Sequence, residues 1–189
     1  MTRVDVISNE RVLDDRHHLH EFQDFWRERP VALVFLPQFG SAFALEQAKE
    51  LTARHDEIAA LGADVVLIGI GTSIQGFTFR QRAASRTPVM VTEDHTLYRT
   101  MGLATRRRLL DPYRLGRGIV RVLGKGVYPY QRTGDPARLG GIFVVDRGGR
   151  AVTWEYRQKH VADVIPGDRV VDALRAVAAA HEPDRLSAR

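Results

Sequence analysis

The sequence predicts an α/β fold in which a mixed central sheet is flanked by helices. Two continuous apolar runs, at residues 31–36 and 63–70, lack polar alternation and are typical of strands buried on both faces. Segments with helical spacing of apolar residues follow these runs, which indicates parallel β-α-β units. Gly148 and Gly149 separate two later strand-like runs and predict a hairpin, so the sheet is expected to be mixed.

The elements are expected in the order β-α-β-α-β-α, a basic insert, and then β-β-α. The strands are expected at residues 31–36, 63–70, 88–92, 141–146 and 151–156. Helices are expected at residues 41–61, 73–84, 96–101 and 168–181, with a further short helix at 17–26. Ser73 is expected to cap the N-terminus of its helix, and Gly62 and Gly102 are expected to end theirs.

Length and composition favour one domain over residues 1–189. The 189 residues include no cysteine, which excludes disulfides, thiolate metal sites and cysteine nucleophiles. No apolar run reaches the roughly 18 residues of a membrane span, and the charged N-terminal segment is unlike a signal peptide. A cytoplasmic location and a frayed polar tail at about residues 182–189 are therefore expected.

The positive charge of the chain is concentrated in an insert at about residues 104–140. Eight arginines and Lys125 against two aspartates give this segment a net charge of +7, so the rest of the chain, at +5 overall, carries −2. Arg114, Arg117 and Arg121 are spaced to form a basic stripe on an amphipathic helix. Such a helix suits an anionic lipid surface, an acidic protein or a phosphorylated ligand. Alternatively, the arginine stems pack on the domain and their heads form ion pairs.

A longer pattern surrounds the first predicted strand and helix. Residues 35–47 read FLPQFGSAFALEQ, and further matching segments lie at residues 66–71, 88–103, 134–141 and 160–163. Together these segments resemble the peroxiredoxin-like 2 group of the AhpC/TSA superfamily over nearly the whole chain. The resemblance implies a thioredoxin-like fold of peroxiredoxin type and a possible homodimer.

The two cysteine positions of that group are occupied by Ser41 and Ala44. A helix N-terminus stabilises negative charge, so a cysteine placed there has a lowered pKa and reacts as a thiolate. A serine hydroxyl is far less acidic and forms no disulfide. Neighbouring positions of the loop differ from the group as well, which indicates a paralogue that has abandoned thiol chemistry.

Two interpretations of Ser41 are open. It is either a nucleophile, with His160 as base and Asp163 as the residue that orients it, or an N-cap of the helix that follows. The expected ligand pocket comprises Gln38, Phe43, Ala44, Arg138, Gly140 and Gly141 around Ser41, and the basic insert is a second expected binding region.

Three histidines near the N-terminus are candidate metal ligands. His17 and His20 share one face if residues 17–26 are helical, although a solvated cluster explains His17, His18 and His20 as well. No cofactor is predicted, with haem or a metal left open. Nucleic acid is not expected as a partner, because no binding motif accompanies the charge.

Three functions follow from these observations. The first is a redox-inactive, peroxiredoxin-like protein that binds an unknown small-molecule or anionic ligand, or a partner. The second is an enzyme with non-thiol or cofactor-dependent chemistry in the same pocket. The third is the antioxidant oxidoreductase activity that the resemblance implies, although the residues that would carry it are the missing cysteines.

Overall fold

The computed structural model describes residues 4–93, 95–103, 112–129 and 138–186. Its centre is a seven-stranded mixed sheet in the order β2-β1-β5-β4-β3-β6-β7. The strands are β1 (Arg11–Asp14), β2 (Leu19–Glu21), β3 (Val31–Phe35), β4 (Asp64–Ile70), β5 (Val89–Thr92), β6 (Gly141–Val145) and β7 (Val152–Arg157). β3, β4 and β5 are parallel, and the other neighbours pair antiparallel. The predicted α/β fold with a mixed sheet is confirmed.

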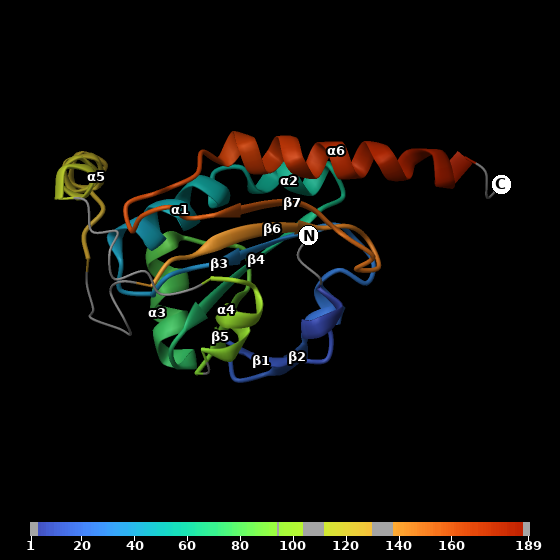
Figure 1. Ribbon diagram of the computed structural model, residues 1–189, viewed down its shortest axis with the longest axis horizontal. Coiled ribbons are helices and arrows are strands. Elements are labelled where there is room, and N and C mark those ends of the chain that lie inside the picture. The colour runs from blue at the N-terminus through green and yellow to red at the C-terminus, as the bar shows by residue number, and fades with distance from the viewer. Residues whose placement is uncertain (1–3, 94, 104–111, 130–137, 187–189) are drawn as a thin grey trace.

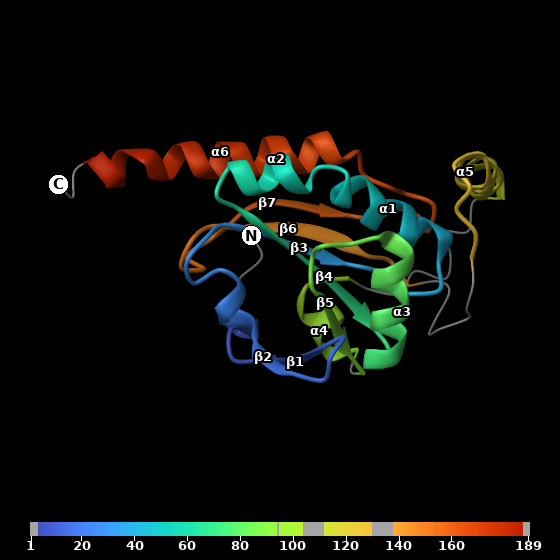
Figure 2. The same cartoon turned by 180° about the vertical axis from the view of Figure 1, so that it is seen from behind.

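Helices cover both faces of this sheet (Figure 1, Figure 2). They are α1 (Ala42–Thr52), α2 (His55–Ala60), α3 (Ser73–Ala83), α4 (Thr96–Thr100), α5 (Pro112–Gly124) and α6 (Gly167–Leu186), with the 3-10 helices η1 (Asp5–Ile7) and η2 (Phe22–Phe25). None of the described helices is both long and apolar enough to cross a membrane.

The central strand β3 shows why the strand-like runs lack alternation. Ala32 and Val34 belong to the hydrophobic cluster formed with α1, α2, α3 and α6. Val31, Leu33 and Phe35 belong to the cluster on the opposite face, with η1, η2 and α4. Because both faces are covered, both sets of side chains must be apolar.

The N-terminal segment differs from the prediction. The prediction of a helix at residues 17–26 was wrong, because residues 11–21 form the β1-β2 hairpin and the short 3-10 helix η2 follows it. The carboxylate of Asp14 accepts the backbone N–H groups of Arg16 and His18, both at 2.8 Å, and His17 adopts a positive φ of 69°. These bonds close a turn where helical spacing predicted a helix.

The predicted helix over residues 41–61 is two helices. Its apolar spacing has a gap between Leu51 and Ile58, where Arg54 and His55 stand. The helix is interrupted there, and the Arg54 guanidinium forms an ion pair with Asp168 at the start of α6. The predicted C-terminal role of Gly62 is confirmed by its φ of +65° immediately after α2.

Three further predictions, on a helix cap, a helix end and a hairpin, can be compared with the structure. Ser73 is not the cap of α3, because the Thr72 hydroxyl accepts the N–H of Gln75. α6 extends to Leu186, past the expected start of a frayed tail at residue 182. The predicted hairpin at Gly148 and Gly149 is confirmed between β6 and β7. Residues 104–111 and 130–137 of the insert lie outside the described residues.

Candidate functional site

The first element of the candidate site is the N-terminus of α1, which follows the loop after β3. Ser41 has an extended backbone, and its Oγ accepts the N–H of Phe43 at 3.2 Å. This contact is that of an N-cap, the second of the two interpretations that the sequence left open. Ala44, the other position at which the resemblance places a cysteine, lies in the first turn of α1 and is buried in the core.

Gly140 and Gly141 lie beside the end of β3. A Cβ atom on Gly140 would overlap the carbonyl oxygen of Phe35, so only glycine fits this close approach. The N–H of Gly140 donates to the Gln158 side chain at 2.7 Å, and that side chain in turn donates to the Asp163 carbonyl at 2.6 Å. Gly140 therefore allows close backbone packing beside the end of β3.

A small cavity adjoins these predicted binding residues. It has a volume of about 10 Å³ and is lined by residues that include Pro37, Gln47, Gly141, Gln158 and Ile165. That volume accommodates about one water molecule. Gln47 also bridges to the backbone of Ile165 in both directions, at 2.8 and 3.0 Å, and closes the space from the helix side.

Arg138 is a buried cation near the ends of β3 and β4. Its guanidinium lies 5.7 Å from the centroid of the Tyr98 ring, and its Nε has no hydrogen-bond partner among the described residues. The Tyr98 hydroxyl lies 2.6 Å from the carbonyl of Leu36 and 3.0 Å from that of Ile68. Burial raises the pKa of Tyr98 well above its usual value, against the opposing effect of the Arg138 charge.

His160 and Asp163 do not form the hydrogen bond of a catalytic triad. The Asp163 carboxylate accepts the Tyr156 hydroxyl and the Lys159 N–H, both at 2.8 Å. The Nδ1 atom of His160 is buried without a hydrogen-bond partner in the described part of the chain. Burial and the hydrogen bond to Asp163 raise the pKa of Tyr156 to about 12. Asp163 therefore orients Tyr156 and the loop after β7.

The histidines near the N-terminus meet at one carboxylate instead of sharing a helix face. Oδ2 of Asp14 lies 3.0 Å from His18 Nδ1 and 3.3 Å from His20 Nε2, whereas His17 occupies the turn. His17 and His20 therefore do not share a helix face, because this segment is a hairpin. Among the described residues no group of three or more potential ligand side chains converges as a metal site.

The insert contributes α5, which confirms the helix predicted around Arg114, Arg117 and Arg121. Arg121 forms hydrogen bonds from Nε and Nη2 to the buried carboxylate of Glu46, and Lys125 also pairs with Glu46 at 2.9 Å. The latter contact raises the pKa of Lys125. α5 is thus attached to α1 by ion pairs, while Arg117 lies over the Tyr113 ring on its own helix.

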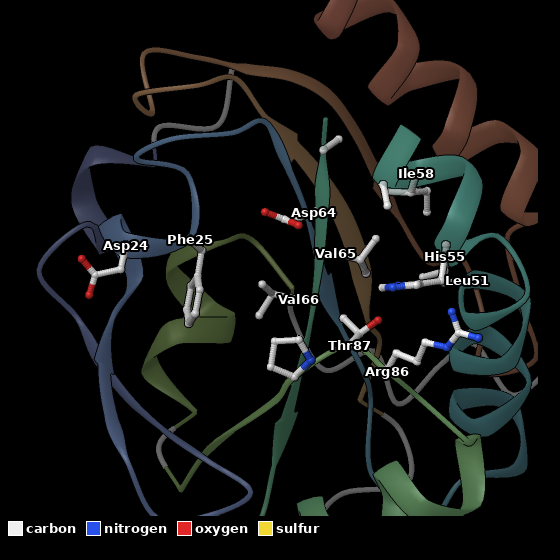
Figure 3. Close-up of a pocket in the computed structure, with 13 residues that line it drawn as sticks. Asp24, Phe25, Leu51, His55, Ile58, Asp64, Val65, Val66, Arg86 and Thr87 are labelled. Carbon is white, nitrogen blue, oxygen red and sulfur yellow. The ribbon is translucent and has the colours of Figure 1, made fainter. Parts of the chain in front are cut away.

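A larger pocket lies at the other end of the parallel strands, beside the start of β4, and has no counterpart in the sequence predictions (Figure 3). Its volume is about 390 Å³. Phe25 from η2 stands on one side, Leu51 and Ile58 from α1 and α2 on the other, and Arg86 and Thr87 before β5 form part of the wall. These side chains come from separate segments, so no local motif could have indicated the pocket.

The fold and the α1 loop together define a thioredoxin-like protein of the peroxiredoxin class. A family model described as AhpC/TSA antioxidant enzyme matches residues 50–160, so the chain belongs to the AhpC/TSA family. The match begins beyond Ser41 and Ala44, the positions at which this chain lacks cysteine.

Individual relatives agree with this assignment. Prostamide/prostaglandin F synthase from Salmo salar is 28% identical over 159 residues, which cover 82% of this chain and 78% of that protein. Peroxiredoxin-like 2A from Danio rerio is 27% identical over 185 residues, covering 92% and 82%.

Solved structures show the same fold. Peroxiredoxin Q from Xanthomonas campestris superposes with a TM-score of 0.68 at 15% identity, covering 92% of this chain and 94% of that one. Peroxidoxin BcpB from Mycobacterium tuberculosis superposes with a TM-score of 0.63 at 18% identity, covering 88% and 92%.

Proposed function

We propose that this chain is a redox-inactive member of the AhpC/TSA family that keeps the scaffold for binding. The observation that carries the proposal is Ser41, which stands where the resemblance places a reactive thiol and acts as the cap of α1. Reduction of a peroxide by this class requires a thiolate that attacks the O–O bond and is then restored by a thiol donor. The chain contains no cysteine, so no cysteine thiolate can carry out either step.

The relatives named prostamide/prostaglandin F synthase do not change this conclusion. The activity that the resemblance implies would reside in the cysteine positions, and Ser41 and Ala44 supply neither a nucleophile nor a redox couple there. The cavity of about 10 Å³ beside Pro37 and Gly141 is also too small for a lipid substrate.

The first test is peroxide consumption by the full chain. We expect hydrogen peroxide and cumene hydroperoxide to be consumed at the rate of the buffer blank, with either thioredoxin and its reductase or glutathione as donor. Turnover above the blank that depends on the donor would overturn the proposal. Donor-dependent turnover that also disappeared in Ser41→Ala would place the activity at the N-terminus of α1, although a hydroxyl could not itself be the redox group.

The binding role is assigned to the pocket of Figure 3. Its volume of about 390 Å³ falls in the range of small-molecule sites, and its wall combines apolar side chains with a few polar groups. Phe25, Ile58 and Val66 supply the apolar surface, and His55 and Thr87 supply hydrogen-bonding groups. Asp24, Asp64 and Arg86 also line the pocket, so the ligand class that fits is a small molecule that combines an apolar part with several polar or charged groups.

A matched pair of variants tests this site. Ala59 lines the pocket, whereas the adjacent Ala60 does not, and both are exposed on α2. A fragment library screened by thermal shift should contain compounds that stabilise the wild-type chain and Ala60→Trp but not Ala59→Trp. An absence of stabilising fragments, or equal stabilisation of the two variants, would contradict the assignment.

A further inference from the structure

Helix α5 has one face that packs on the domain and another that faces outward. Gly118 and Val122 are buried on the inner face, where a Cβ atom on Gly118 would lie only 2.5 Å from the Ala162 Cβ. On the outer side Val120 is 73% exposed, and Ile119 and Leu123 are exposed as well. Large apolar side chains are therefore gathered on the solvent side of a helix that already has a packed side.

The outer face is amphipathic along its length. At 3.6 residues per turn, Tyr113, Val120 and Leu123 fall on one strip, and Ile119 borders it. Arg114 and Arg117 fall on the adjacent strip, and the described helix contains no acidic residue. An apolar strip beside a basic strip is the arrangement of helices that lie in a membrane interface.

The third arginine of α5 has a different role. Arg121 donates hydrogen bonds to Glu46 and, at 2.9 Å, to the carbonyl of Ala162. It therefore holds the helix on the domain and does not add to the outward charge. Three glycines make residues 112–124 a poor helix former in isolation. Docking on α1 therefore presents the outer face as a ready-formed helix, and a surface that binds it need not induce folding.

We propose that α5 docks the protein onto an anionic lipid surface. The helix would lie parallel to that surface, with Val120, Leu123 and Ile119 entering the headgroup region and Arg117 meeting lipid phosphates. α5 stands at the end of the molecule opposite the C-terminal end of α6, so a flat surface can approach it (Figure 1, Figure 2).

Charge argues for lipid over a second copy of the chain. A two-fold dimer through α5 would use the same face of both copies, and an antiparallel pair of helices would set the two basic strips side by side, where like charges repel. Arg121 and Lys125 are paired with Glu46 and Glu50 on α1. Without these two charges the net charge of +7 over residues 104–140 falls to +5, which still favours a surface with many negative groups and disfavours a neutral one.

The test is flotation of the full chain with vesicles. We expect binding to vesicles of phosphatidylcholine with about a third phosphatidylglycerol, little binding to phosphatidylcholine alone, and release at high salt. Val120→Asp should lower partitioning by about tenfold or more. Ile74→Asp is the matched control, because Ile74 on α3 is 71% exposed and should leave binding unchanged.

Because the chain has no cysteine, a single labelled position provides a second readout. An environment-sensitive fluorophore on Val120→Cys should shift to shorter wavelength on anionic vesicles, and the same label on Ile74→Cys should not. Absence of wild-type binding to anionic vesicles, or equal responses at the two positions, would overturn the proposal. Lipid-independent association that is lost in Val120→Asp would overturn it too, by assigning this face to a second copy.

Discussion

The guanidinium of Arg121 on α5 holds the carboxylate of Glu46 on α1 with two nitrogen atoms. Nε lies 3.1 Å from Oε1 and Nη2 lies 3.0 Å from Oε2, and Glu46 is only 2% exposed. A buried carboxylate of this kind needs hydrogen-bonded partners, and a second partner, Lys125, comes from the end of the same helix. α5 is thus integrated into the scaffold beside α1.

The first prediction concerns the stability of this junction. Arg121→Ala leaves Glu46 with Lys125 alone and should lower the free energy of unfolding by about 1–3 kcal/mol. Arg117→Ala, on the outer face of the same helix, should change it by less than about 0.5 kcal/mol. Urea denaturation followed by circular dichroism measures both. Equal effects of the two substitutions would show that Glu46 does not anchor α5.

The second prediction compares two glycines of α5. A Cβ atom on Gly118 meets Ala162 at 2.5 Å and the Phe43 ring at 3.0 Å, whereas one on Gly116 meets nothing within 4 Å. Gly118→Ala should therefore destabilise the protein by about 1–3 kcal/mol through overpacking. Gly116→Ala should stabilise it by about 0.5–1 kcal/mol, because alanine is the better helix former. The same sign of effect on the melting temperature in both variants would refute this packing.

The central strands could be predicted from sequence because burial on both faces leaves an unmistakable pattern in β3 and β4. β1 could not be predicted in this way, because the burial of its side chains does not follow their polarity. Asp14 is buried and Leu13 is exposed, so apolar alternation points to the wrong face. The buried carboxylate of Asp14 is stabilised by hydrogen bonds from the turn, and that of Asp15 by an ion pair with Arg80 at 3.1 Å.

The candidate site shows a similar division. Helical spacing predicted α5, and the resemblance identified Ser41 as the degenerate position. The ion pair between Arg121 and Glu46 could not be predicted from the sequence, because Glu46 lies 75 residues earlier and no local pattern indicates that it is buried. The expectation of a homodimer and of a cytoplasmic location stays a prediction.

The third prediction uses the electrostatics of the α1 N-terminus. Ser41→Cys places a thiol where the N–H groups of the first turn stabilise negative charge, so its pKa should fall below the usual value of about 8.5. Ser85→Cys is the control, because Ser85 is also half-buried but follows the C-terminal end of α3. The pH dependence of alkylation by iodoacetamide measures both pKa values. A Ser41→Cys pKa equal to or above that of Ser85→Cys would contradict the prediction.

The fourth prediction concerns acid stability and the β1-β2 hairpin. Burial alone would raise the pKa of Asp14, but the N–H groups of His18 and Arg16 and the two histidine side chains hold it well below the ordinary value of 3.8. The unfolded chain then binds this proton more readily than the folded one. Stabilisation by Asp14 is therefore complete above about pH 4 and is lost as the pH falls through the lower, folded-state pKa.

Asp14→Asn tests this linkage directly. At pH 7 it should lower the free energy of unfolding by about 1–2 kcal/mol, because the amide accepts the turn hydrogen bonds less well than the carboxylate. The difference from wild type should shrink steadily below about pH 4, where the wild-type advantage is itself titrated away. Asp56→Asn is the control, since Asp56 is 85% exposed and its pair with Arg86 contributes little. Urea titrations at a series of pH values give the two curves, and a difference between Asp14→Asn and wild type that stays constant down to pH 2 would exclude the mechanism.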